Sequence, residues 1–155
     1  MDIENILNKF EQNYKTLSSS EENALAQFIS AFEKYVAKID PIIKIMKKHD
    51  LYFTHPDLPN IYTIHGPIIG RNKYDSYIYI YDENGFVQEI NYNNDNQSSD
   101  RMPFRIFAKG CDIKFAYRGI KHIIPRLNEI IKIEEGKINT LTSLTQNFSE
   151  ELNKL

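Results

Sequence analysis

The stretch GIKHIIPRLNEIIKIEEGKINTLTSLTQNFSEELNKL, residues 119–155, decides the fold. Its apolar side chains recur every three to four residues over about five heptads, which is the pattern of an amphipathic helix. Gly136 lowers helix propensity by about 1 kcal/mol and predicts a bend or weak turn, whereas Pro125 suits the first turn of the main helix. The stripe consists of Ile120, Ile123, Ile124, Leu127, Ile130, Ile131, Ile138, Leu141, Leu144, Phe148, Leu152 and Leu155.

A helix of this length is too long for a compact domain of this size to cover. At ~1.5 Å per residue it reaches roughly 45–54 Å, whereas a compact chain of 155 residues has a radius of gyration near ~15 Å. The helix therefore overhangs the domain or meets another chain, and we expect a homodimer or higher oligomer. The residues expected at that contact are Leu127, Ile131, Ile138, Leu141, Leu144, Phe148 and Leu152.

The first fifty residues predict two further helices. Residues 2–17 and 22–49 both carry apolar side chains at helical spacing, and Ser18-Ser19-Ser20 separates them. Ser19 and Glu22 have the spacing of a capping box, and Asp40-Pro41 predicts a kink before the helix ends near His49. Two helices joined by a short polar loop form an antiparallel hairpin, whose apolar face is expected to pack against the C-terminal helix.

Residues 51–118 change to the two-residue period of strands. Short strands are expected at 51–54 and 61–65, around the proline-rich segment HPDLPN. The clearest hairpin is SYIYIYDENGFVQEINY, residues 76–92, with a three-residue turn and Gly85 in the left-handed conformation. In that register Ile78, Ile80, Phe86 and Ile90 share the core face, and Tyr77, Tyr79 and Tyr81 share the other.

Residues 93–101 are polar and predict a mobile surface loop, and residues 103–109 and 112–118 predict a last hairpin. Because the strands are not interleaved with helices, the fold class is α+β. We expect an N-terminal helical hairpin (1–50), an antiparallel meander of about five to six strands (51–118) and a long C-terminal helix (119–155), within one domain spanning 1–155.

Composition limits the classes of protein. With 41% hydrophobic residues the chain can bury one core, and a net charge of −2 argues against a basic coat for nucleic acid. The lone Cys111 excludes an intrachain disulfide and suits a reducing compartment. We expect a cytoplasmic protein, of the producing or host cell, with no membrane partner. The absence of Trp amid abundant Ile, Asn, Lys and Tyr suggests an AT-rich genome, in which phage or plasmid accessory factors and inhibitors are common.

Charge is unevenly distributed along the meander. Residues 71–100 hold two cations and six carboxylates, a balance of −4, whereas residues 101–126 hold seven cations and one carboxylate, a balance of +6. In the expected last hairpin like charges face each other, which favours an anionic partner: an acidic protein surface, a nucleotide or nucleic acid. The expected partner-binding residues are Tyr77, Tyr79, Tyr81, Arg105, Lys109, Lys114 and Arg118. Two alternatives stay open, namely that carboxylates of the same sheet neutralise the cations and that the long helix covers the tyrosines.

Catalytic and metal-binding motifs are weak. His55, Asp57 and His65 flank one loop and are the only metal candidates with any spacing argument, although zinc needs three or four ligands at defined geometry. Cys111 lacks any sign of an activated thiol, and Asp82-Glu83 fits turn chemistry because Asn84-Gly85 follows. We expect no cofactor.

The leading hypothesis is a non-enzymatic binding protein that oligomerises through helices and presents its sheet to an anionic partner. The first alternative is a nucleic-acid-binding protein that uses the basic segment 101–126. The second is a metal-dependent enzyme at the loop between His55 and His65.

Overall fold

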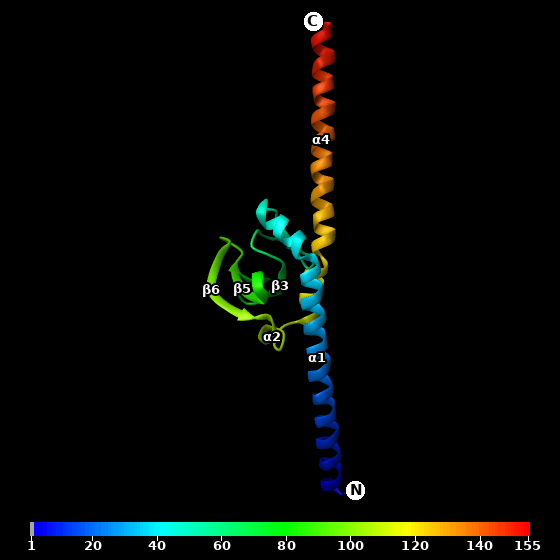
Figure 1. Ribbon diagram of the computed structural model, residues 1–155, viewed down its shortest axis with the longest axis vertical. Coiled ribbons are helices and arrows are strands. Elements are labelled where there is room, and N and C mark those ends of the chain that lie inside the picture. The colour runs from blue at the N-terminus through cyan, green and yellow to red at the C-terminus, as the bar shows by residue number, and fades with distance from the viewer. Residues whose placement is uncertain (1) are drawn as a thin grey trace.

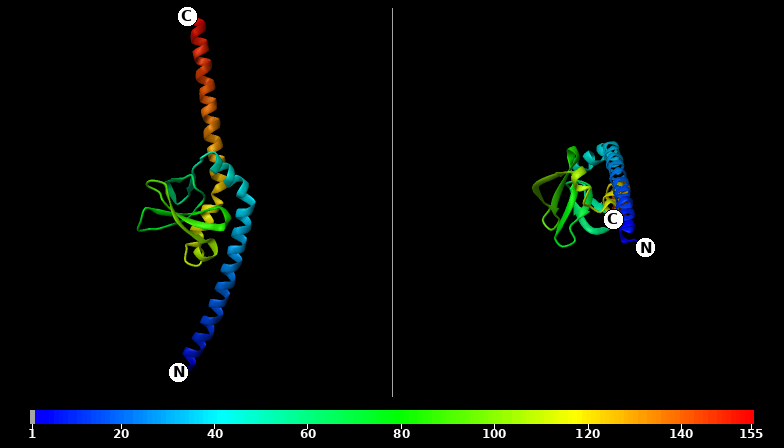
Figure 2. Two further views of the ribbon diagram at one scale, coloured as in Figure 1. Left: turned by 60° about the vertical axis from the view of Figure 1, so that its left-hand side comes forward. Right: turned by 90° about the horizontal axis from the view of Figure 1, so that it is seen from below.

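The computed structural model describes residues 2–155, including every side chain in that range except those of Ser98 and Ser99. Two long helices, α1 (Ile3–Lys48) and α4 (Ile123–Lys154), lie along one axis, and a small body of strands and short helices sits beside the point where they meet (Figure 1). The first half of α1 and most of α4 extend beyond this body in opposite directions (Figure 2). The fold class is α+β, as the sequence predicts.

The N-terminal region is one helix, so the predicted helical hairpin is wrong. α1 continues through Ser18, Ser19 and Ser20 without interruption. Serine costs an α-helix only a few tenths of a kcal/mol relative to good helix formers, and no Gly or Pro lies beside the three serines to break the helix there. Phe10 and Phe28 are 18 residues apart, which is about five helical turns, so the two apolar segments lie on the same face of one helix.

The C-terminal part of α1 changes direction, as Asp40-Pro41 predicts. Pro41 lies inside the helix, and the cyan segment around it tilts away from the axis of the rest of α1 (Figure 2). Proline has no N–H to donate and its ring crowds the preceding turn, which is the usual cause of such a kink. The helix ends at Lys48 with His49 as its C-cap, close to the predicted end.

The described residues form six strands in two antiparallel sheets. β1 (Phe53–His55) pairs with β2 (Leu58–Thr63). β3 (Ile68–Arg71), β4 (Tyr77–Tyr81), β5 (Phe86–Asn91) and β6 (Asn96–Pro103) form a four-stranded meander in the order β3-β4-β5-β6. The number of strands agrees with the prediction, but their positions agree only in part. No strand was predicted at β3, β6 takes up most of the expected 93–101 loop, and short helices replace the strands expected at 103–109 and 112–118.

The hairpin of β4 and β5 has the predicted register. Tyr81 pairs with Val87 and Tyr77 with Asn91, and the turn consists of the short helix η1 (Glu83–Gly85). Gly85 has φ of +80°, the left-handed conformation predicted for it, and Asn84 is also left-handed with φ of 67°.

Two short helices follow β6, although alternating apolar residues in this segment predicted strands. α2 (Phe104–Phe107) buries Phe104, and α3 (Ile113–Lys121) buries Ala116, Gly119 and Ile120, which follow helical spacing. Asp112 begins α3 as its N-cap, because its carboxylate accepts a hydrogen bond of 3.2 Å from the N–H of Phe115. A strand reading would instead have buried Tyr117, which is half exposed.

Each face of the four-stranded sheet contacts a hydrophobic core. On one face Ile78, Ile80 and Ile90 pack with Leu58 and Ile68, so the predicted core face of the hairpin is confirmed for these three residues, whereas Phe86 is only half-buried and lies outside this core. On the other face Val87 and the half-buried Tyr79 and Tyr81 pack with the second core, which is formed by parts of α1, α2, α3 and α4. Among the residues described, no helix has the length and apolarity needed to cross a membrane.

Candidate functional site

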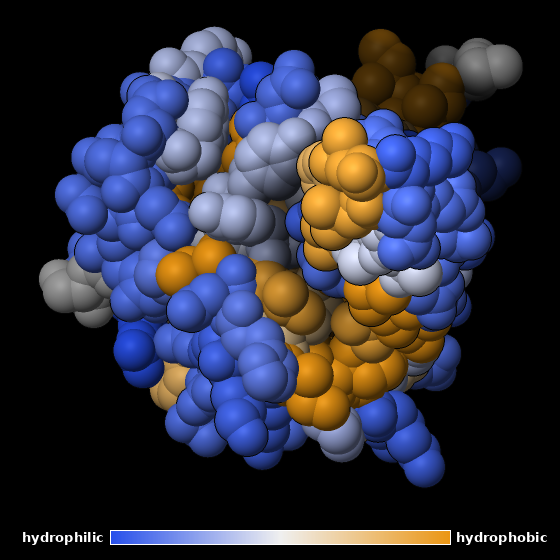
Figure 3. Space-filling view, turned by 90° about the horizontal axis from the view of Figure 1, so that it is seen from above, coloured by the Kyte–Doolittle hydropathy of each residue, from blue (hydrophilic) through white to orange (hydrophobic). Residues whose placement is uncertain are grey.

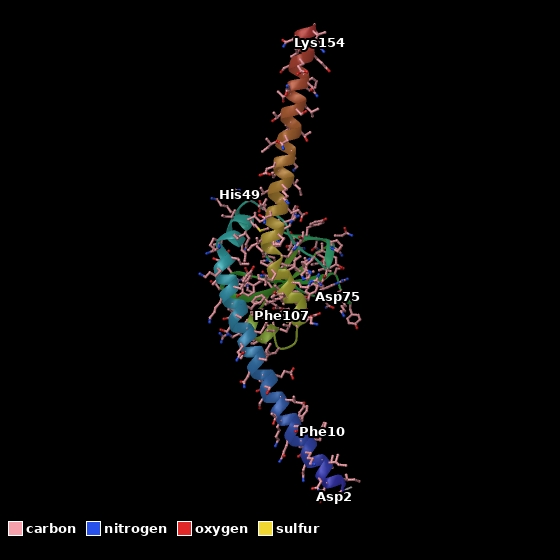
Figure 4. All side chains as sticks on the ribbon, turned by 90° about the vertical axis from the view of Figure 1, so that its right-hand side faces the viewer. Asp2, Phe10, His49, Asp75, Phe107 and Lys154 are labelled. Carbon is pink, nitrogen blue, oxygen red and sulfur yellow. The ribbon has the colours of Figure 1, made fainter. Side chains whose placement is uncertain are left out.

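The N-terminal arm, residues 3–24 of α1, has an uncovered apolar face. Phe10 is 66% exposed and lies on a stretch of helix that no other element approaches (Figure 4). Further along α1 the same face enters the body, where Ile29 and Phe32 are buried. The exposed apolar residues of the arm are Ile3, Ile6, Leu7, Phe10, Tyr14 and Leu17.

The C-terminal arm, residues 131–155, repeats this arrangement at the other end of the molecule. Ile123 is buried in the body, and Leu141, which follows it by 18 residues or about five turns on the same face, is 64% exposed. Viewed down the arm, hydrophobic atoms gather on one side and hydrophilic atoms on the other (Figure 3). Of the residues predicted to make the oligomer contact, Leu127 packs against the core and the rest are exposed: Ile131, Ile138, Leu141, Leu144, Phe148 and Leu152.

The body contains a pocket of about 600 Å³ between the edge strand β3 and helices α2 and α3. Its apolar walls include three aromatic side chains, those of Tyr79, Phe107 and Phe115, and the rings of Tyr79 and Phe107 lie 5.3 Å apart. Arg71 and Lys73 stand at its edge, both exposed and with no side-chain partner among the described residues. Asp112 also lines the pocket, and its carboxylate accepts a hydrogen bond from the N–H of Phe115. The two cations outnumber this one carboxylate, so the pocket suits a flat apolar ligand with an anionic group.

Gly70 helps to shape this pocket. A Cβ atom at this position would lie 2.8 Å from Cζ of Phe107 and 3.1 Å from the Tyr79 ring, so only glycine lets the Phe107 ring lie across β3. Cys111 lines the same pocket, and burial raises the pKa of its thiol, so the thiolate that nucleophilic chemistry needs is disfavoured there.

The structure does not gather the seven predicted partner-binding residues on one surface. Because α2 and α3 take the place of the predicted hairpin, the predicted cross-strand pairs of like charge do not form. Arg105 forms a bidentate pair with Glu33 of α1 at 3.0 and 3.2 Å, and Arg118 pairs with Asp57 at 2.8 Å. Lys109 and Lys114 are exposed, with no side-chain partner in the part of the chain that the structure describes.

The three tyrosines are also divided. Tyr79 lines the pocket, and Tyr81 packs on Phe32 and Phe104 with ring centroids 5.7 Å away in each case. Tyr77 lies in a separate shallow depression with Glu89. The alternative that the long C-terminal helix covers the tyrosines is wrong for Tyr81, because its ring packs against α1 and α2 instead.

The histidines predicted as metal candidates do not converge. His55 is buried, its Nε2–H donates to the carbonyl of Phe115 at 2.8 Å, and its Nδ1 accepts from the N–H of Asp57 at 3.0 Å. His65 instead contacts Asp95 and Gln97 near β6. Within the described residues, no group of three His, Cys, Asp or Glu side chains is arranged to hold a metal ion.

Asp82 and the partly buried His122 each have partners within the chain. Asp82 accepts a hydrogen bond of 2.7 Å from the N–H of Glu83 and pairs with Arg101 at 3.4 Å, which is turn chemistry as predicted. His122 contacts the hydroxyl of Thr54 at 3.1 Å, and burial lowers the pKa of its imidazole.

Sequence reasoning missed the pocket and the uncovered face of the N-terminal arm. The arm could have been recognised from the sequence, because the apolar residues before and after Ser18-Ser19-Ser20 keep the same helical spacing and so lie on one face. The pocket could not, because Gly70, Phe107 and Cys111 come together only once residues 104–121 are helical.

Comparison with protein-family models, with curated proteins and with solved structures found no match to this chain. Its function is therefore inferred from its own geometry.

Proposed function

We propose that the chain is a non-enzymatic binding protein that assembles with a second copy of itself through its helical arms. The observation that carries this proposal is the continuity of the two apolar stripes. At each end of the molecule the face that packs into the body continues for several turns onto an arm that no other described residue covers.

Uncovered arms of this kind are energetically unfavourable in isolation. In water a lone helix is marginally stable, and most of its stability in a protein comes from burial of its apolar face. Large exposed apolar patches on a folded chain usually mark an interaction surface. Phe10, Leu17, Leu141 and Phe148, each at least 64% exposed, form such patches.

A second copy is the occupant that fits best. The arms point away from each other, so a chain cannot cover one of its arms with the other (Figure 1). A second chain turned end over end supplies, at each end, an arm of similar length with its own uncovered face. Two copies can thus cover all four apolar faces and leave none for further growth, which is the closed symmetry most common among oligomers.

The assembly is tested by light scattering after gel filtration. We expect about 36 kDa, twice the 18.2 kDa of one chain, at both low and high salt, because the contact is apolar. Phe148→Asp should give a monomer, whereas Asn147→Asp, one residue away and off the stripe, should leave the mass unchanged. A wild-type mass of 18.2 kDa at micromolar concentration would refute the assembly.

A second function, the binding of an anionic aromatic ligand, is supported by the pocket beside β3. Arg71 and Lys73 could each reach an anionic group, and the Tyr79 and Phe107 rings offer stacking surfaces for a planar ring such as a nucleobase. Under this proposal a nucleotide or another anionic partner binds in the pocket rather than on the sheet face expected from the sequence.

The cysteine in the pocket provides the test. Because Cys111 is the only cysteine of the chain, its alkylation rate reports on this site alone. We expect AMP to slow alkylation more than adenosine, since only AMP carries a phosphate, and Arg71→Gln to remove the difference. Lys109→Gln, which removes an exposed cation that does not line the pocket, is the matched control. Equal protection by AMP and adenosine would refute an anionic ligand.

Nucleic acid remains the alternative partner. Lys109 and Lys114 are exposed cations of the basic segment, but Arg101, Arg105 and Arg118 are each paired with a carboxylate of this chain. An oligonucleotide that binds through phosphates should lose affinity steeply with salt, because each contact releases counterions. Flat salt dependence would exclude this mode.

A further inference from the structure

We infer that the N-terminal arm of one copy pairs antiparallel with the C-terminal arm of a second copy, in the register that sets Leu17 opposite Leu141. This inference rests on the proposed self-assembly and adds to it which arms meet and how they align. It is carried by the spacing of the two stripes, by the position of their charged members and by the direction of the two helices.

The two stripes have matching heptad frames. In the N-terminal arm one position holds Leu7, Tyr14 and Glu21, and the position three residues later holds Ile3, Phe10, Leu17 and Ala24. In the C-terminal arm the corresponding positions hold Glu134, Leu141, Phe148 and Leu155, then Lys137, Leu144 and Glu151. When two helices pair antiparallel, residues at the first position of one helix lie level with the second position of the other, so one register aligns both frames throughout.

In this register the apolar residues meet each other. Residues 3–24 overlap residues 134–155 completely, over about 33 Å of helix. Two levels are mixed, with Leu7 beside Glu151 and Ala24 beside Glu134. The four levels that are apolar on both sides are Ile3 with Leu155, Phe10 with Phe148, Tyr14 with Leu144 and Leu17 with Leu141.

The same register pairs opposite charges inside the seam. Glu21 is the one charged residue in the N-terminal frame, and it falls level with Lys137. Glu21 is exposed in its own chain, and Lys137 pairs there with Glu134 at 3.1 Å on an exposed surface. A polar pair at a seam position adds little stability but fixes the register of two helices.

Pairing between identical arms is less favourable. Two N-terminal arms aligned in parallel set Glu21 against Glu21, and aligned antiparallel over their full length they set it against Ile3 or Phe10. Two C-terminal arms aligned antiparallel over their full length set Glu134 against Glu151. The unlike-arm register also sets Glu151 and Glu134 beside apolar residues, but it sets no like charges together and it pairs Glu21 with Lys137. Like charges in a seam cost stability, so the identical-arm pairings are less favourable than this register.

The direction of the helices allows both pairs to form at once. α1 and α4 run the same way along the long axis of the molecule, from the N-terminus at one end to the C-terminus at the other (Figure 1). A copy rotated by half a turn about a perpendicular axis therefore presents its C-terminal arm, reversed, to the N-terminal arm of the first. The same rotation brings the remaining two arms together, which gives a closed two-fold dimer.

Disulfide trapping tests the register. In a Cys111→Ser background, chains carrying Leu17→Cys and chains carrying Leu141→Cys are purified separately with tags of different size, mixed and oxidised. We expect a cross-linked product that contains one chain of each kind. Phe148→Cys in place of Leu141→Cys is the control, because seven residues displace the thiol by about 10 Å, beyond the ~7 Å that a disulfide spans between Cα atoms.

The outcomes separate this inference from the assembly itself. If light scattering gives a monomer, self-assembly fails, and this inference fails with it. If it gives a dimer but the Leu17–Leu141 product is absent, or each variant cross-links to itself instead, assembly stands and the pairing of unlike arms is overturned.

Charge reversal gives an independent measurement. Glu21→Lys sets a lysine opposite Lys137 at both ends of the dimer, and we expect it to raise the dimer dissociation constant by about tenfold or more. Adding Lys137→Glu should return that constant to within about threefold of the wild type, because the opposite charges face each other again. Additive losses in the double variant, measured by sedimentation equilibrium, would overturn the pairing.

Discussion

Replacing Gly119 with alanine places a methyl group where α3 contacts β3. Its Cβ would overlap the carbonyl oxygen of Ile68 and lie 2.9 Å from Cδ2 of His55. Neither neighbour can easily move, because the Ile68 carbonyl belongs to the backbone of a strand and the buried His55 ring is held by hydrogen bonds at both nitrogens. The helix must therefore move away from the strand by on the order of 1 Å, which opens the core on that side.

The magnitude follows from two opposing terms. Overpacking of a rigid core costs about 1–3 kcal/mol and sometimes more, whereas Gly→Ala inside a helix is worth up to about 1 kcal/mol in propensity. Gly136 isolates the second term, since a Cβ there meets nothing within 4 Å. We expect Gly119→Ala to lower the free energy of unfolding by about 1–3 kcal/mol and Gly136→Ala to raise it by about 0.5–1 kcal/mol.

Urea unfolding followed by circular dichroism measures both changes at one fixed protein concentration, so that assembly contributes equally. The midpoints of the two variants should move in opposite directions with unchanged slopes. If Gly119→Ala were as stable as the wild type, or shifted in the same direction as Gly136→Ala, the close contact of α3 with Ile68 would be refuted.

Two further predictions concern the body. Burial lowers the pKa of His55 and of His122 below the usual 6.5, so the unfolded chain binds protons there that the native state does not. Their contribution to the free energy of unfolding should be complete above pH 6.5 and should fall as the pH is lowered from 6.5 towards the folded pKa values. Urea titrations at several pH values measure this dependence, and the control variant His49→Gln, at an exposed histidine, should retain it. Asp112→Ala should lower the free energy of unfolding by about 1 kcal/mol, because it removes the N-cap of α3. Asp2→Ala should fray only the tip of the N-terminal arm and leave the urea midpoint of the body unchanged. Equal midpoint shifts in the two variants would contradict the placement of these caps.

The sequence predicted those parts of the fold in which the apolar residues follow either the helical or the strand repeat, but not both. The heptad of residues 119–155 predicted α4, and the alternation of residues 76–92 predicted the β4–β5 hairpin with its register and turn. Both signals depend only on local geometry, because the side chains that a helix or a strand places on one face are fixed by its own repeat.

The errors occur where two periods compete over a short segment. In residues 112–118 Ile113, Phe115 and Tyr117 alternate, so the segment fits a strand, yet Asp112 is an N-cap and Ala116 is buried next to Gly119 and Ile120. The contact of Gly119 with β3 favours the helix, and that contact joins residues 51 positions apart in the chain. A local sequence pattern contains no information about a contact between residues so far apart in the chain, so the pocket that depends on this contact was not predictable.

The arms show a different limit of sequence reasoning. The stripe of residues 119–155 was read correctly as a face that something must cover, but its period is the same whether the cover comes from this chain or from another. The structure distinguishes the two cases, because Ile123 and Leu127 are covered by the body while Leu141 and Phe148 of the same face are exposed. The body covers the apolar face of α4 only as far as about Ile130, so beyond that residue a second copy would have to cover it. The charges of Glu21 and Lys137 would select which arm of the second copy packs there.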